Sequence, residues 1–165
     1  MDKKKILDNT LVKKKIIRIS LQIIESNIDE KEIIIAGIEK KGFIFAKRIS
    51  NEIKKKSNIE TKLCSITVNK KNPMDKIFIS LKTNDYENKS VVIVDDVLNS
   101  GSTLIYAVKY FLNTKLKKLK TAVLVDRNHK KYPIKADFKG LSLSSSVQNH
   151  VEVEINEKEI NAYLI

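Results

Sequence analysis

The stretch Val91–Thr103 reads VVIVDDVLNSGST, and it carries three local signals in succession. Four β-branched apolar residues run into the adjacent carboxylates Asp95 and Asp96, and two further apolar residues lead into a loop of small polar residues. Beyond the loop, apolar residues recur at helical spacing over positions 104–111. The pattern predicts a buried strand, a polar loop at its carboxyl end and an amphipathic helix.

The polar loop is the predicted ligand site, because ligands of open α/β sheets bind at the carboxyl ends of the strands. Small residues at a helix N-terminus offer backbone N–H groups and the positive end of the helix dipole, which suit a phosphate. The paired aspartates cannot bind a phosphate directly, but they can accept hydrogen bonds from sugar hydroxyls or hold a cation. The simpler alternative is a strand-to-helix turn whose aspartates only cap or solvate the strand end.

This stretch resembles the signature of type I phosphoribosyltransferases, in which a hydrophobic strand, two acids and two apolar residues precede a Ser/Thr-Gly-x-Thr loop. The resemblance implies an α/β fold with a mainly parallel sheet flanked by helices, a flap hairpin and a C-terminal β hood. It also implies that Asp95 and Asp96 are the catalytic acids and contact the ribose of phosphoribosyl pyrophosphate (PRPP). The residues implied to cradle its 5′-phosphate are Asn99, Ser100, Gly101, Ser102 and Thr103.

Length and composition limit the kinds of protein that this chain can be. At 165 residues the chain is predicted to form a single domain spanning residues 1–165. Its one cysteine, Cys64, allows no internal disulfide and fits the cytoplasm. No apolar run approaches the roughly 20 residues that span a bilayer, so we expect no membrane segment. One cysteine and two scattered histidines predict no zinc site.

A second strand–loop–helix unit precedes the first. Glu32–Gly37 is predicted as an apolar strand, and a helix follows with Phe43, Ala46, Ile49 and Ile53 on its buried side. Lysines in the intervening loop can supply charge for a pyrophosphate. The resemblance implies that this loop binds the pyrophosphate of PRPP. The residues concerned are Glu39, Lys40, Lys41 and Gly42.

That loop departs from the nearest branch of the family, which usually carries Thr-Arg before the glycine. Here Lys40 and Lys41 occupy those places, and a lysine lacks the planar fork with which arginine selects its ligand geometrically.

A hairpin flap is predicted from a strand at residues 60–68, a polar turn at 69–76 and a strand at Ile77–Leu81. In the family, a flexible loop at this place closes over PRPP and excludes water. Related members carry Tyr-Arg-Asp-Asp in the flap, whereas this chain reads Val-Asn-Lys-Lys at residues 68–71. The missing arginine and acids bear on turnover more than on PRPP binding.

The segment Asp126–Gly140, after a strand predicted at Thr121–Val125, narrows the resemblance. It is similar to pyrimidine-operon attenuator proteins that are also uracil phosphoribosyltransferases, whose pattern is Val-Asp-Arg-Gly-His, a short variable stretch, then Pro-Ile-Arg-Ala-Asp. Asn128 and Lys135 are the main departures from it. The base-binding residues implied here are Asp126, Arg127 and Ile134. The resemblance covers nearly the whole chain and includes a closing hairpin at residues 151–164.

The first predicted helix, residues 9–27 with Asn9 or Thr10 as its cap, bears on RNA binding. Lysines 13–15 and Arg18 form either a solvated face or a basic contact for RNA. The related attenuators carry Thr-Arg-Ile-Ala-His here, and this chain reads Ile-Arg-Ile-Ser-Leu at 17–21, which weakens RNA recognition. The net charge of +12 fits a polyanionic partner, or reflects only a composition rich in lysine.

Three functions remain open from the sequence. The chain is a phosphoribosyltransferase that converts uracil and PRPP to uridine monophosphate (UMP) and pyrophosphate, a UMP-responsive RNA-binding regulator, or a PRPP-binding relative with another base or weak turnover. Mg²⁺ is expected to enter with PRPP and without a dedicated protein site. The resemblance also predicts a homodimer or a higher homo-oligomer.

Overall fold

The central element of the computed structural model, which describes residues 3–144, 150–156 and 158–165, is a six-stranded sheet in the order β4-β3-β2-β5-β6-β7. All neighbouring strands run parallel except β3 and β4, which are antiparallel. The mainly parallel α/β fold expected from the sequence is therefore confirmed. The strands are β2 (Glu32–Ile38), β3 (Glu60–Thr67), β4 (Phe78–Ile79), β5 (Ser90–Leu98), β6 (Lys118–Asp126) and β7 (Phe138–Ser142).

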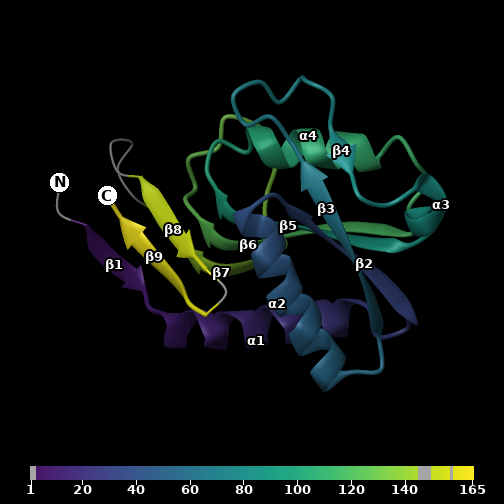
Figure 1. Cartoon of the computed structure of the whole chain (residues 1–165), viewed down its shortest axis with the longest axis horizontal. Helices are drawn as coiled ribbons and strands as arrows, with labels where there is room; N and C mark the ends of the chain where they lie inside the picture. The colour runs from purple at the N-terminus through teal and green to yellow at the C-terminus, as the bar shows by residue number, and fades with distance from the viewer. Residues whose placement is uncertain (1–2, 145–149, 157) are drawn as a thin grey trace.

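Helices cover both faces of this sheet. Helices α1 (Asn9–Ser26) and α2 (Lys41–Lys56) lie on one face, and α4 (Ser102–Phe111) lies on the other (Figure 1). The short helix α3 (Thr83–Tyr86) leads into β5. Because both faces are covered, the central strands β2 and β5 bury almost every residue, which explains the apolar runs at residues 33–38 and 91–94.

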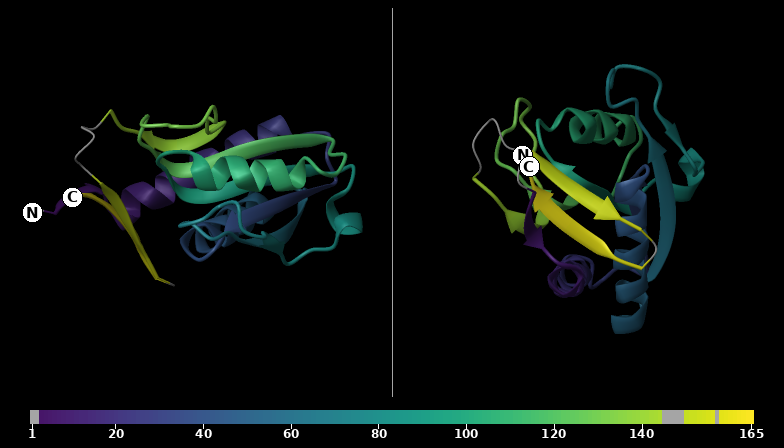
Figure 2. Two further views of the ribbon diagram at one scale, coloured as in Figure 1. Left: turned by 90° about the horizontal axis from the view of Figure 1, so that it is seen from above. Right: turned by 60° about the vertical axis from the view of Figure 1, so that its left-hand side comes forward.

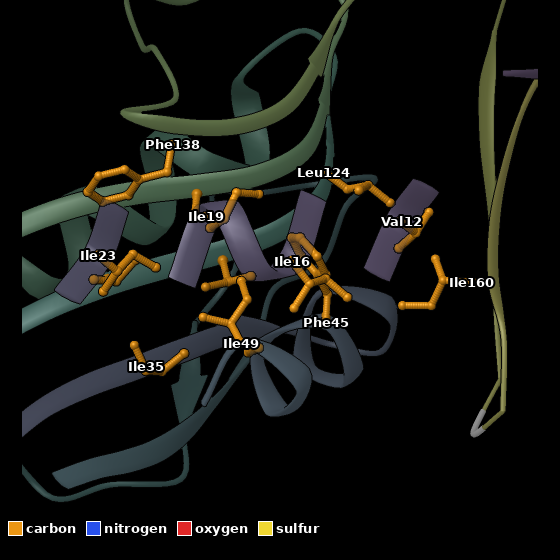
Figure 3. Packing of buried hydrophobic residues seen from close by; sticks show 14 of the residues in the cluster. Val12, Ile16, Ile19, Ile23, Ile35, Phe45, Ile49, Leu124, Phe138 and Ile160 are labelled. Carbon is orange, nitrogen blue, oxygen red and sulfur yellow. The ribbon is translucent and has the colours of Figure 1, made fainter. Parts of the chain in front are cut away.

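The larger part of the core lies between α1, α2 and the sheet. Ile19 and Ile23 of α1 are fully buried and belong to the same core cluster as Phe45 and Ile49 of α2 (Figure 3). The sequence placed Phe43 on the buried side of α2, and this is wrong. The buried positions of α2 start at Gly42 and recur at i+3, i+4 and i+7, so Phe43 is left partly exposed.

The N-terminal end of α1 differs from the prediction by one residue. Asp8 is the cap, and its carboxylate accepts a hydrogen bond from the backbone N–H of Leu11 at 2.8 Å. Asn9, which was predicted as a cap, is bonded elsewhere. Its backbone N–H donates to the side chain of Asn161 and its side-chain oxygen accepts from the backbone N–H of Ile160, each at 3.1 Å.

A second, three-stranded antiparallel sheet forms the hood at one end of the molecule (Figure 2). The predicted C-terminal hairpin is confirmed as β8 (Val151–Ile155) and β9 (Ile160–Leu164). The sequence did not predict its third strand, β1 (Lys4–Leu7), which pairs with β9. The Arg48 guanidinium donates to the carbonyl of Asn156 at 3.1 Å, so the hood is tied to α2 as well as to α1.

The flap hairpin is confirmed, with a shorter second strand than predicted. Strand β4 comprises two residues instead of the predicted Ile77–Leu81. Strand β6 begins at Lys118, before the predicted Thr121. Within the described ranges, no helix combines the length and the hydropathy needed to cross a bilayer.

Candidate active site

A cavity of about 370 Å³ opens at the carboxyl end of β5. Three separate parts of the chain wall it: the end of β5 with the N-terminus of α4, the start of α2, and the flap. Strand β8 of the hood adds a fourth wall. The polar residues that line the cavity are Lys41, Lys70, Asp95, Asp96, Asn99, Ser100, Thr103 and Glu152.

The carboxylate pair lies at the floor of this cavity. Asp95 and Asp96 are only 4% and 7% exposed, and the backbone N–H of Asp96 donates to the Asp95 carboxylate at 2.9 Å. Burial, and then the neighbouring charge of Asp96, raise the pKa of Asp95 well above its usual range, while Lys70 opposes the shift. Ionised Asp95 is therefore costly in the free protein, and a positively charged ligand would stabilise it.

The loop between β5 and α4 ends at the N-terminus of a helix. Gly101 precedes the helix with a φ of 85°, a left-handed conformation that favours glycine. Helix geometry leaves the first backbone N–H groups of α4 without partners inside the helix. The hydroxyl of Ser100 accepts one of them, from Ser102, at 3.3 Å. Residues 99–101 and Thr103 line the cavity, and backbone donors at a helix N-terminus suit an anion.

The loop between β2 and α2 contributes charge through Lys41, which lines the cavity. Gly42 is buried, and its backbone packs closely against β5. A Cβ at this position would lie 2.8 Å from the Val94 carbonyl oxygen and 3.0 Å from the Asp95 Cα. Glu39 is exposed, and its carboxylate accepts a hydrogen bond from the Thr67 hydroxyl at 3.0 Å. Of the two adjacent lysines, Lys41 is the one that lines the cavity together with the carboxylate pair.

The residues predicted to bind the base contact the loop between β5 and α4. The buried Arg127 guanidinium donates to the side-chain oxygen of Asn99 at 2.8 Å. Ile134 packs on Gly101 so closely that a Cβ at residue 101 would lie 2.4 Å from its methyl group. The Asp126 carboxylate is fully buried and pairs with Lys139 at 3.3 Å. The segment after β6 therefore supports the loop between β5 and α4.

Two parts of the cavity wall were absent from the predicted site. Lys70 of the flap lines the cavity, and so do residues 151–153 of the hood. The sequence placed Lys70 in a flap but gave no sign of which flap side chain would face inward. The hood residues are separated from the aspartates by more than 50 positions, and long-range contacts, such as the pairing of β1 with β9, hold the hood in place.

The sheet order, the flap, the hood and the position of the acids together define the type I phosphoribosyltransferase fold. Solved structures with this fold superpose on the chain over almost its whole length. A hypoxanthine-guanine phosphoribosyltransferase from Bacillus anthracis, 22% identical, gives a TM-score of 0.76 and covers 98% of each chain. The hypoxanthine phosphoribosyltransferase of Trypanosoma cruzi, 17% identical, gives 0.75 and covers 96% of this chain and 95% of its own.

The family model for the phosphoribosyl transferase domain matches residues 2–158, and the chain belongs to this family. Curated relatives point in the same direction. The bifunctional protein PyrR of Enterococcus faecalis is 32% identical over 166 residues, covering 96% of this chain and 93% of that protein. The bifunctional protein PyrR of Clostridium kluyveri is 33% identical over 159 residues, covering 92% and 90%.

Proposed function

We propose that the protein transfers the phosphoribosyl group of PRPP to uracil, forming UMP and releasing pyrophosphate, and that residues 1–165 act as one domain. The observation that carries the proposal is the cavity itself. It brings a buried carboxylate pair between an anion-binding helix end and the lysine of a second loop. A molecule that joins a phosphate, a ribose and a pyrophosphate matches these three features in the same order.

In the proposed reaction the bond from ribose C1 to pyrophosphate breaks as a nitrogen of the base attacks C1. Positive charge develops on the ribose in an oxocarbenium-like transition state. Asp95 and Asp96 would orient the ribose hydroxyls and place negative charge beside that ring. No side chain needs to act as a nucleophile, because the base attacks directly.

The 5′-phosphate would lie in the loop at the start of α4. The ligands we assign to it are Asn99, Ser100, Gly101, Ser102 and Thr103. Asn99 already accepts from Arg127, so we assign it the role of fixing the loop. The Thr103 hydroxyl lines the cavity and is the side chain best placed to donate to the phosphate.

The pyrophosphate would face the loop at the start of α2, where we assign Glu39, Lys40, Lys41 and Gly42, with Lys41 as the charge inside the cavity. Mg²⁺ prefers phosphates, carboxylates and waters, so it would enter as part of a magnesium–PRPP substrate. The cavity fits such a substrate, since Asp95 and Asp96 present carboxylates beside the place of the pyrophosphate.

The base would occupy the side of the cavity nearest the hood and the segment after β6. Ile134 offers an apolar surface for a pyrimidine ring, and backbone groups can read its edge. We propose that Asp126 and Arg127 serve the base indirectly, because their side chains already pair with Lys139 and Asn99. They would hold the segment that carries Ile134.

Uracil is proposed on the likeness of residues 126–140 to the attenuator proteins. The solved structures with the same fold act on hypoxanthine or guanine, so the base is the part of the proposal most in need of a test. Pyrophosphate release should be followed with PRPP and each nucleobase in turn. Release with uracil alone supports the proposal, and release with hypoxanthine or guanine alone would refute the uracil assignment.

We further propose that the protein works in the cytoplasm as a homo-oligomer. Exposed apolar side chains gather on α1, with Ile17 37% and Leu21 49% exposed one turn apart, and they offer a surface to a second copy. Sedimentation of the parent protein and of Leu21→Lys tests this. A monomeric parent would contradict the oligomer.

RNA binding is proposed as a weak second activity. Lys13 and Lys14 are exposed on α1, but the Arg18 guanidinium donates to the carbonyls of Lys139 and Gly140 at 2.9 and 2.7 Å. The residue that would best fork onto a phosphate or a base is therefore engaged with β7. The remaining lysines position an RNA backbone without reading its sequence.

A further inference from the structure

The flap contributes one positive charge to the cavity, the ammonium of Lys70, and this group lies near one carboxylate. The ammonium of Lys70 lies 4.0 Å from the carboxylate oxygen of Asp95, and both residues line the same cavity. The Lys70 side chain is 52% exposed, whereas that of Asp95 is 6% exposed. One end of the pair is thus fixed in the floor, and the other is carried on a hairpin at the surface.

The distance indicates a loose pair. At 4.0 Å the ammonium is beyond hydrogen-bonding range of the carboxylate, so the donors of Lys70 are still available to a ligand. A lysine carries three donors on a flexible stem and can exchange partners without moving its backbone far. A pyrophosphate offers several charged oxygens, and it would compete well for Lys70 against one carboxylate.

The backbone around Lys70 is held by the flap itself. The side-chain oxygen of Asn69 accepts from the backbone N–H groups of Lys71 and Asn72 at 3.0 and 3.3 Å. The Asn69 amide in turn donates to Asp75 at 2.7 Å. These bonds depend on Asn69, Asp75 and the backbone, so the side chain of Lys70 can be changed without dismantling the turn.

We propose that Lys70 is an exchangeable counterion, which neutralises Asp95 in the free protein and passes to the pyrophosphate of PRPP when the substrate binds. The exchange would leave the Asp95 carboxylate to face the ribose. Lys70 would thereby supply the positive charge of a flap that lacks arginine. The inference rests on the proposed function, because it requires that PRPP occupies this cavity.

The test compares Lys70→Met with Lys71→Met, which removes an equal charge from the next residue of the same turn. Calorimetry should measure the affinity for magnesium pyrophosphate, for PRPP with magnesium, and for UMP. We expect Lys70→Met to weaken the first two about tenfold and UMP less than twofold, because UMP carries no pyrophosphate. Lys71→Met should match the parent, and Lys70→Arg should restore most of the lost affinity.

Hydrogen exchange of the flap separates an exchanged counterion from a merely structural lysine. Magnesium pyrophosphate should slow exchange at residues 68–76 in the parent and in Lys71→Met, but not in Lys70→Met. Equal affinities for Lys70→Met and the parent, or equal losses in the two methionine variants, would overturn the inference and leave the proposed function standing. A parent protein that fails to bind PRPP would overturn both.

Discussion

Two loops occupy equivalent places in two adjacent strand–loop–helix units (Figure 1). The first leads from the end of β2 into the start of α2, over residues 38–42, and the second leads from the end of β5 into the start of α4, over residues 98–102. They are built in different ways. The second loop is braced from behind, because the backbone N–H of Lys131 donates to the Ser100 carbonyl at 2.8 Å and Arg127 holds Asn99. The first loop has exposed lysines and a glycine packed against Asp95.

If the proposed function is correct, the difference corresponds to two ways of binding an anion in one cavity. The braced loop presents a preorganised set of backbone donors, which suits a phosphate that remains attached to the product. The lysine loop presents a mobile point charge, which suits a pyrophosphate that must depart. Mutations in the two loops should therefore affect different ligands, and the following experiments test this division.

The largest effect is expected between the loops, at the carboxylate pair. Asp96→Asn keeps the size of the side chain and removes its charge, so it should lower kcat about 100-fold and change KM for PRPP much less. The reason is that the charge matters most as the oxocarbenium forms. Steady-state kinetics with PRPP and uracil measures the split. A rate equal to that of the parent would exclude a catalytic role for Asp96.

The next largest effect should come from the braced loop. Thr103→Val keeps the shape of the side chain and removes the hydroxyl donor, and the loss of a hydrogen bond to a charged group costs about 1.5–3 kcal/mol. Affinity for both PRPP and UMP should therefore fall at least tenfold, since both carry the 5′-phosphate. Calorimetry with the two ligands measures this. Unchanged affinity for both would refute the assignment of this loop.

The complementary change in the lysine loop should discriminate between ligands. Lys41→Met should weaken magnesium pyrophosphate and PRPP about tenfold, while the affinity for UMP stays within twofold of the parent. Lys40→Met is the comparison within the same proposed site and should lose less, because the exposed Lys40 is not among the residues that line the cavity. Equal losses in the two variants would mean that only the net charge of the loop matters.

How far the sequence predicted these loops depends on the range of the contacts. The strand, the acids and the small-residue loop of residues 91–103 are encoded locally, and the structure places them as predicted. The packing of Ile134 on Gly101 and the entry of residues 151–153 into the cavity depend on the pairing of distant strands. The misplaced Phe43 and the missed β1 also result from tertiary contacts that no local pattern records.

A smaller effect, on stability, should follow from removing the charge of Asp95. Its raised pKa means that ionisation costs folding free energy, and this cost appears as the pH rises from the unfolded value near 4 through the folded value. Asp95→Asn should therefore melt higher than the parent at neutral pH, by about 2–4 °C for each 1 kcal/mol relieved. The difference should disappear below about pH 4.

Thermal melts across pH measure this effect, with Glu60→Gln as a control at an exposed acid on β3. The amide side chain introduced by Asp95→Asn keeps an oxygen that can accept from the Asp96 backbone N–H, so the test isolates the charge. A variant that melts lower than the parent at neutral pH would show that the Asp95 charge stabilises the free protein.

The smallest effect is expected outside both loops, on α1, where Lys13 and Lys14 are exposed. Specific RNA recognition needs bases held by stacking and edge hydrogen bonds, and α1 carries no aromatic residue. Binding to a pyrimidine-operon leader hairpin and to a scrambled hairpin should therefore be nearly equal, and it should fall steeply with salt as counterions are released. Titrations at low and physiological salt, with and without UMP, measure both ratios. If UMP strengthened binding to the true hairpin alone at physiological salt, α1 would be a third anion-binding surface, with a preference for sequence. The division between a braced loop and a lysine loop would then no longer account for all of the ligands of this protein.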